Sequence, residues 1–350
     1  MQRFLILIAI LAFVCFPAAA QEKPLTQPEY VKLLYAAENN AALTDELITA
    51  VRRRGIDFSV TSGILSLTRT KSKNNADLRR ALEEANRRRD AGPSASRFSQ
   101  AEADELLKRT RENSLAAVAE MPDFVVKQLI QRSAAYAGTN NFRPQDRLVV
   151  AVSYRASGQE EYKVLSVNGL VQPNPEVRRS YSEVGGASST GEFVTILSTV
   201  FKPENDTVFT MVDTDTIRER RALMFDYEIT RDKARQVLSV GGLATDSAIS
   251  GMKGRLWVDI ETGRVLRIES EATEIPKGFA MSSARRTVDY DWTMIGEERY
   301  LLPVLSDVRM VQRYRDQMYE SRNVIRFREY QKFGTEVIIG DDEDVIVSDQ

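Results

Sequence analysis

The chain has 350 residues, of which 43% are hydrophobic and 28% charged, and its formal net charge is −2. These are ordinary values for globular proteins, the length allows two domains, and the charge balance does not indicate a polyanion-binding protein. The sequence contains no histidine, and its one cysteine is Cys15. Ser-His-Asp and Cys-His nucleophile systems are therefore excluded, as are zinc or haem sites that depend on imidazole or thiolate. An enzyme would be restricted to Asp, Glu, Lys, Tyr or Ser-Lys chemistry, and a bound metal to calcium or magnesium held by carboxylates.

Residues 1–20 predict a secretory signal peptide. Arg3 supplies the positive start, Phe4–Phe16 forms the apolar core, and small alanines precede the expected cleavage after Ala20. The apolar run is shorter than the about 20 residues that span a membrane, so cleavage is favoured over an uncleaved anchor. Cys15 follows two bulky residues that fit a lipobox poorly, so it is expected to be removed with the signal. The mature protein is predicted to be periplasmic or secreted, without cysteine, and not integral to the membrane.

A small module of short helices is predicted for residues 28–90. Helices are expected over 29–39, from an N-cap at Thr44 to Gly55, over 62–70, and from Asn75 or Asp77 onward. Three arginine runs lie in this module, at 52–54, 79–80 and 87–89. They could form a basic patch for nucleic acid or anionic lipid. Solvated helix faces and helix C-termini are the favoured interpretation, and export makes nucleic acid the less plausible partner.

Residues 91–98 have the Gly-Pro-Ser composition of a linker, and a second domain is expected over 99–339. Ser99 and Glu102 form a capping box for a helix that Pro122 ends. The β-branched content of 123–130 favours a strand there. The acidic residues within 340–350 predict a disordered tail.

The remaining chain alternates apolar and polar residues, which is typical of antiparallel strands. Strands are expected at 147–154, 161–167, 207–212, 222–230 and 236–240, and in a meander over 254–333. A Gly- and Ser-rich loop is expected at 181–191, and a helix at 192–201.

The apolar face of the predicted meander has two possible roles. It could be a core packed against the 192–201 helix and the helix before Pro122, or it could be the wall of a lipid-sized cavity. The residues alone favour the packed core. Asp289 and Asp291 share one strand face, but carboxylates on a half-exposed strand more often belong to its solvated side than to a catalytic site. If a cavity exists, its lining is predicted to include Phe193, Leu197, Val258, Ile268, Tyr290, Trp292, Val304 and Phe327.

Several short motifs resemble those of exported bacterial proteins. The motifs are Met121-Pro122-x-Phe124-x-x-x-Gln128, Gly191-Glu192-Phe193, the 259–268 hairpin, Val288–Asp291, Leu301–Val304 and Asn323–Phe333. Together they resemble uncharacterised secreted proteins with the periplasmic lipoprotein-carrier (LolA/LolB-like) fold, an incomplete β-barrel wrapped over helices. The segment 44–90 is similar to a small helical module attached to other exported proteins. The carriers bind acyl chains without catalysis, so the resemblance implies the same mode here.

The predicted fold class is α+β, with a strongly curved antiparallel sheet (an incomplete barrel) packed on helices and preceded by a small all-α bundle. The predicted function is non-catalytic binding of a lipid, acyl chain or other apolar ligand in the cell envelope, with no cofactor and no metal. The alternative is an envelope interaction or sensor protein with a packed core, which would meet a partner protein through its 28–90 module.

Overall fold

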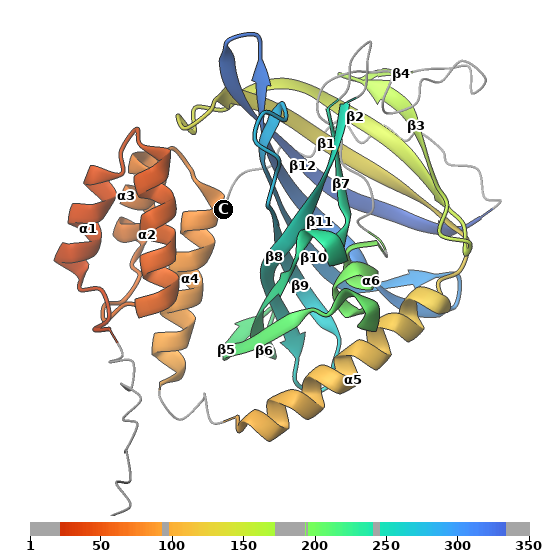
Figure 1. Ribbon diagram of the computed structural model, residues 1–350, viewed down its shortest axis with the longest axis horizontal. Coiled ribbons are helices and arrows are strands. Elements are labelled where there is room, and N and C mark those ends of the chain that lie inside the picture. The colour runs from red at the N-terminus through yellow and green to blue at the C-terminus, as the bar shows by residue number, and fades with distance from the viewer. Residues whose placement is uncertain (1–21, 93–97, 172–192, 194, 241–245, 334–350) are drawn as a thin grey trace, which may run out of the picture.

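The computed structural model describes residues 22–92, 98–171, 193, 195–240 and 246–333 (Figure 1). The predicted signal peptide, the loop at 181–191, the tail at 340–350 and most of the predicted linker lie outside the described residues.

The chain begins with four helices that share one hydrophobic cluster. They are α1 (Gln27–Ala36), α2 (Ala41–Arg54), α3 (Ser62–Lys71) and α4 (Ala76–Ala91). Buried Leu34, Val51, Ile64 and Leu82 join the four helices at their common centre. Asn75 caps α4, which settles the choice between two predicted starts.

Thr44 was the predicted N-cap of α2, and that prediction is wrong. Asn40 caps the helix, because its side-chain oxygen accepts the backbone N–H of Leu43 at 3.2 Å. Thr44 lies inside the first turn and donates its hydroxyl to the Asn40 carbonyl at 2.9 Å. Asn and Thr both cap helices well, so the residue type alone could not distinguish them.

The longest helix, α5 (Gln100–Ala119), carries the predicted capping box, since Ser99 and Glu102 bond each other's backbone N–H groups. It ends before Pro122, and β1 follows directly, as predicted. The predicted 192–201 helix is observed as α6 (Thr195–Phe201), and two short helical turns follow later, η3 (Pro203–Asn205) and α7 (Arg231–Ala234).

The described strands form one 12-stranded antiparallel sheet. They are β1 (Phe124–Tyr136), β2 (Arg143–Tyr154), β3 (Glu160–Val167), β4 (Leu170–Val171), β5 (Val208–Ile217), β6 (Arg220–Ile229), β7 (Gln236–Val240), β8 (Asp246–Asp259), β9 (Val265–Thr273), β10 (Met281–Ile295), β11 (Glu298–Tyr314) and β12 (Gln317–Lys332). Their order is β4-β3-β2-β1-β12-β11-β10-β9-β8-β6-β5, with β7 paired to β8 beside this path. The sheet is curved and does not close into a barrel, because β4 and β5 stand at opposite ends of the order (Figure 1).

Helices cover both faces of the sheet (Figure 1). We call the face that carries Val258, Ile268 and Val288 the inner face, and α5 and α6 pack against it through Leu106 and Phe201. We call the opposite face, which carries Arg255 and Glu269, the outer face. Helices α2 and α4 contact the outer face through ion pairs. The inner face is therefore mainly apolar, whereas the outer face carries the charged contacts to α2 and α4 beside a small apolar cluster around Trp257.

Candidate functional site

The apolar residues of the inner face form two separate hydrophobic clusters. The first cluster joins β1, β2, β3, β11 and β12 with Phe193, whose ring lies 5.3 Å from Phe124 and 5.5 Å from Phe327 between centroids. The second cluster joins α5 and α6 with β6, β8, β9 and β10 and contains Leu223 and Val288. The packing of both clusters follows from strand alternation, which directs every second side chain to the same face.

Most of the predicted cavity residues lie in these clusters. Phe193 and Phe327 belong to the first cluster, and Val258, Ile268 and Tyr290 belong to the second. Leu197 of α6 is partly buried against the second cluster. The sequence thus identified residues that the fold brings to one face, and ligand contact at these residues remains a prediction.

Trp292 and Val304 lie differently from the prediction, since both are half-buried and belong to neither cluster. The register between β10 and β11 shifts here, because Asp289 pairs with Leu305 whereas Tyr290 pairs with Pro303. Val304 is the extra residue of this bulge, and a bulge interrupts the strict alternation on which the prediction relied. The Trp292 ring stacks instead under the Arg299 guanidinium, 4.8 Å from its centroid.

A mostly polar row of residues, interrupted by Gly254 and Val308, crosses the inner face near the two clusters. Pairing register links the row strand by strand through Tyr227, Gly254, Ser270, Arg286, Val308, Asn323, Arg132 and Asp146. We call these residues the polar row. The sequence analysis missed it, although Arg286 occupies an apolar phase of the β10 alternation, between Ala284 and Val288.

The ionisable groups at the two ends of the polar row are satisfied within the protein. Arg132 donates from Nε and Nη2 to the two carboxylate oxygens of Asp146, at 2.6 and 2.5 Å. The Tyr227 hydroxyl donates to the Glu269 carbonyl at 2.9 Å, and burial raises the pKa of Tyr227 well above its ordinary value. Arg286, in the middle of the row, is half-buried and has no hydrogen-bond or ion-pair partner among the residues the structure describes.

Gln128 is a second polar residue of the inner face. It is fully buried, and its register neighbours on β2 and β12 are Val150 and Phe327. Neither Nε2 nor Oε1 of its carboxamide has a hydrogen-bond partner within the described chain. An unsatisfied buried polar group costs about 1–3 kcal/mol, so this amide is an unused pair of donor and acceptor in an apolar setting.

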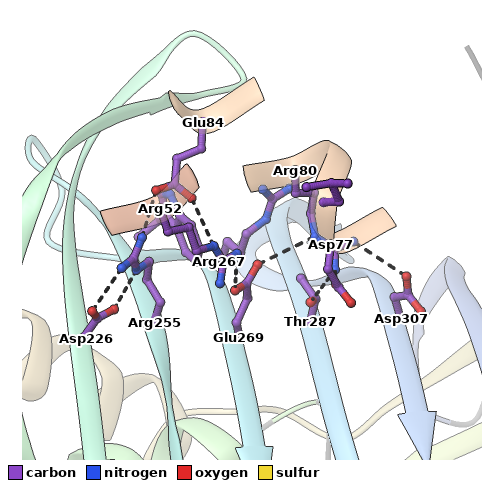
Figure 2. A network of polar contacts seen from close by, with 12 residues as sticks. Arg52, Asp77, Arg80, Glu84, Asp226, Arg255, Arg267, Glu269, Thr287 and Asp307 are labelled. Atoms are coloured by element: carbon purple, nitrogen blue, oxygen red, sulfur yellow. Dashed lines mark hydrogen bonds and ion pairs between the residues drawn. The ribbon is translucent and has the colours of Figure 1, made fainter. Parts of the chain in front are cut away.

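The outer face carries a charged row that meets α2 and α4 (Figure 2). Register aligns one residue from each of five neighbouring strands, namely Asp226, Arg255, Glu269, Thr287 and Asp307. Helix α4 presents Asp77, Arg80 and Glu84 to this row, because a spacing of three and four residues places them on one helix face.

Ion pairs connect the charged row of the outer face to the α4 residues along its length (Figure 2). Arg255 bonds Glu84 of α4 at 2.8 Å and Asp226 of β6 at 2.6 Å. Arg80 of α4 donates to the Thr287 hydroxyl at 3.1 Å and lies 3.6 Å from Asp307. These pairs are partly or fully removed from solvent, so they are screened less than surface pairs.

Burial and the neighbouring arginines shift the pKa values of the acidic residues in this network in opposite directions. Burial raises the pKa of Glu84, although Arg255 and Arg52 act to lower it. Burial also tends to raise the pKa of Asp77, but the neighbouring Arg80 and other arginines outweigh it and hold that pKa well below its ordinary value.

Three arginines of the predicted runs lie in this interface, so the expectation that they are solvated is wrong, although Arg52 does lie in the last turn of α2. Arg52 bonds Glu269 at 2.7 Å, Arg80 meets the β10 and β11 residues named above, and Arg87 donates to both oxygens of Asp215 at 2.7 and 3.0 Å. Arg53, by contrast, keeps a side chain that is 63% exposed. A basic patch made from these arginines is not free for a nucleic-acid or lipid partner, because the sheet's own carboxylates neutralise it.

Asp289 and Asp291 do share the outer face, but Asp289 is not on a solvated side as predicted. It is buried and accepts two bonds from Arg267, at 2.7 and 3.1 Å. Arg218 lies 3.6 Å from Asp289 and 3.5 Å from Asp291. Both carboxylate oxygens of Asp289 are therefore engaged by arginine side chains of the protein itself.

In the described parts of the chain, no group of three or more Asp, Glu, Cys or His residues is placed to hold a metal ion. None of the helices in those parts is both long and apolar enough to cross a membrane.

No family model and no curated protein matches the chain. Among solved structures, a DUF1329 family protein from Desulfovibrio piger is similar at 9% identity and a TM-score of 0.30, over 66% of this chain and 95% of that one. The Pseudomonas aeruginosa MucA/MucB complex is similar at 13% identity and a TM-score of 0.18, over 63% and 94%. A structure of MucB with MucA(peri) gives 13% and 0.18, over 62% and 93%. These scores are too low to carry an argument about this chain.

Proposed function

We propose that this chain is a non-catalytic protein of the cell envelope that binds an apolar ligand, such as a lipid or acyl chain, on the inner face of its sheet. The curved sheet would act as an incomplete barrel around the ligand, with α5 and α6 beside it. The predicted signal peptide supports the envelope location. Residues 28–90 would form a separate module that braces the sheet from outside.

The observation that carries the proposal is the carboxamide of Gln128. It is fully buried on an apolar face and lacks a hydrogen-bond partner in the described chain. A packed core would normally place an apolar side chain here or provide a partner, because an orphaned amide destabilises the fold. A ligand with a carbonyl or hydroxyl group would satisfy the amide, and each buried CH₂ of its chain would contribute about 0.8 kcal/mol.

Native mass spectrometry of the mature protein, exported and purified without detergent, tests this proposal. We expect an additional bound mass, a matching lipid in an organic extract, and a higher melting temperature when monoolein is added to the stripped protein. A clean ligand-free mass, with no stabilisation by fatty acids, lipopeptides or monoolein, would contradict it. That outcome would favour the interaction or sensor alternative, in which a partner would have to use α1 or α3, since α2 and α4 already face the sheet.

A further inference from the structure

Arg286 lies on the inner face of β10, where the two hydrophobic clusters approach each other. Its chain neighbours point to the outer face, since Arg285 bonds Asp45 of α2 and Thr287 accepts a bond from Arg80. On the side of Arg286, Ala284 packs against the first cluster and Val288 belongs to the second. The guanidinium therefore extends from a strand position that is apolar on both sides.

This guanidinium carries a charge that the described protein does not neutralise. Its register neighbours are Ser270 on β9 and Val308 on β11, and neither is acidic. Arg132, in the same polar row, shows the usual arrangement, with both carboxylate oxygens of Asp146 in reach. An arginine stays protonated in proteins, and a partly buried cation without a counterion is unfavourable. Solvent still reaches Arg286, so an anion can also reach it.

We propose that Arg286 binds the anionic headgroup of an amphiphile whose apolar chain lies on the two clusters. The inference rests on the proposed function and specifies its ligand class. The planar guanidinium can donate two parallel hydrogen bonds to a carboxylate or a phosphate, and these charge-assisted bonds are the strong ones. The apolar neighbours on either side would contact the first methylene groups of the ligand's chain. One site would therefore recognise both the charged headgroup and the apolar chain.

Three ligands with the same oleoyl chain test this inference on the mature protein, below their micelle concentrations. They are oleate, oleoyl lysophosphatidate and uncharged monoolein, with affinities measured by titration calorimetry. We expect one or both anions to bind at least about tenfold more tightly than monoolein, the scale of one charge-assisted hydrogen bond. A preference for oleate identifies a carboxylate ligand, and a preference for lysophosphatidate a phosphate ligand.

Arg286→Gln should remove this preference, so that the two anions bind no more tightly than monoolein does to the same variant, whereas Arg286→Lys should keep a preference for anions. Arg285→Gln is the matched control, because it removes the same charge from the adjacent residue on the opposite face, and it should behave like the wild type. Equal affinity of the wild type for monoolein and both anions would overturn the inference while the proposed function stands, as would an unchanged anion preference in Arg286→Gln. If none of the three ligands binds the wild type, the proposed function itself is contradicted.

Discussion

Two interpretations of the inner face, a packed core and a binding surface, can be distinguished by its individual polar side chains. Gln128 appears in a sequence motif, but its burial is not evident from the sequence, because a glutamine in a strand usually faces solvent. Its position becomes informative only once β2 and β12 are known to flank it with Val150 and Phe327.

Gln128→Met replaces the buried amide with an apolar side chain of similar shape. In the ligand-free protein we expect the free energy of unfolding to increase by about 1 kcal/mol, because the unsatisfied donor and acceptor are removed. Urea denaturation measures the change. Gln131→Met is the control, since Gln131 lies on the same strand with an exposed side chain, and it should change stability by less than about 0.5 kcal/mol. A loss of stability in Gln128→Met would show that the amide has a partner within the folded protein.

Asp307 makes the outer network sensitive to acid. Burial tends to raise its pKa, but Arg322, Arg80 and Arg309 outweigh burial and hold the pKa below the ordinary value of 3.8. A carboxyl whose pKa is lower in the folded state adds stability above its unfolded pKa, and this contribution is lost as the pH falls through the folded value.

Asp307→Asn should therefore destabilise the protein at neutral pH, by about 3 kcal/mol for a broken buried pair. The difference from the wild type should begin to shrink below a pH of about 4, where Asp307 becomes protonated in the unfolded state, and should go on shrinking until the pH passes its lower folded-state pKa. Denaturation curves between acid and neutral pH test both statements. Asp104→Asn, at an exposed position of α5, should leave the curves nearly unchanged. A difference that stays constant with pH would mean that Asp307 does not titrate as described.

At the scale of elements, local signals in the chain predicted most boundaries. The capping box of α5 and its end before Pro122 depend on hydrogen bonds and steric limits between residues a few positions apart. The bulge at Val304 was not predictable in the same way, because it is defined by the register of β11 against β10. This irregularity displaces Val304 from the apolar clusters, whereas Trp292 keeps the inner phase of β10 and is only half-buried there.

Helix α5 is hydrogen-bonded to the turn between β8 and β9. Arg109 and Asn113 of α5 donate to the carbonyls of Ile260 and Thr262, at 2.7 and 3.0 Å. Gly263, in the same turn, has φ +63°, and an added Cβ would lie 2.8 Å from Nε of Arg109. The turn therefore favours glycine for its backbone conformation, and an added Cβ would also have to displace the Arg109 side chain.

Gly263→Ala should destabilise the protein by about 2 kcal/mol, part from the left-handed backbone and part from displacing Arg109. Gly158→Ala is the matched control, because Gly158 has φ +85° but no atom within 4 Å of an added Cβ. It should cost only the backbone part, about 1 kcal/mol. Thermal unfolding of both variants gives the comparison, and equal losses would argue against a tight contact between α5 and the turn.

On the scale of the whole molecule, the helices α1–α4 are held to the sheet by charge. Arg285 of β10 donates two bonds to Asp45 of α2, at 3.0 and 2.8 Å, and also interacts electrostatically with Asp77 of the α4 network. Interfaces of this polar kind usually allow relative motion of the two parts, so their coupling can be measured.

A charge swap between Asp45 and Arg285 measures that coupling. Asp45→Arg and Arg285→Asp should each destabilise the protein, because each places like charges together, and the double variant should recover about 1 kcal/mol relative to the sum of the two losses. Urea denaturation of the four proteins completes the cycle. Strictly additive losses would show that α2 and β10 do not make this contact in solution.

The sequence by itself determined the helix and strand content, the apolar alternation of the long strands, and the absence of histidine chemistry. Each of these depends on neighbouring residues or on composition alone. Only the tertiary structure decided that Arg52, Arg80 and Arg87 face carboxylates of the sheet, and that Arg286 faces none in the described chain. The physical reason is that ion pairs and cross-strand rows join residues far apart in the chain. They exist only after strand order and register have fixed which side chains meet.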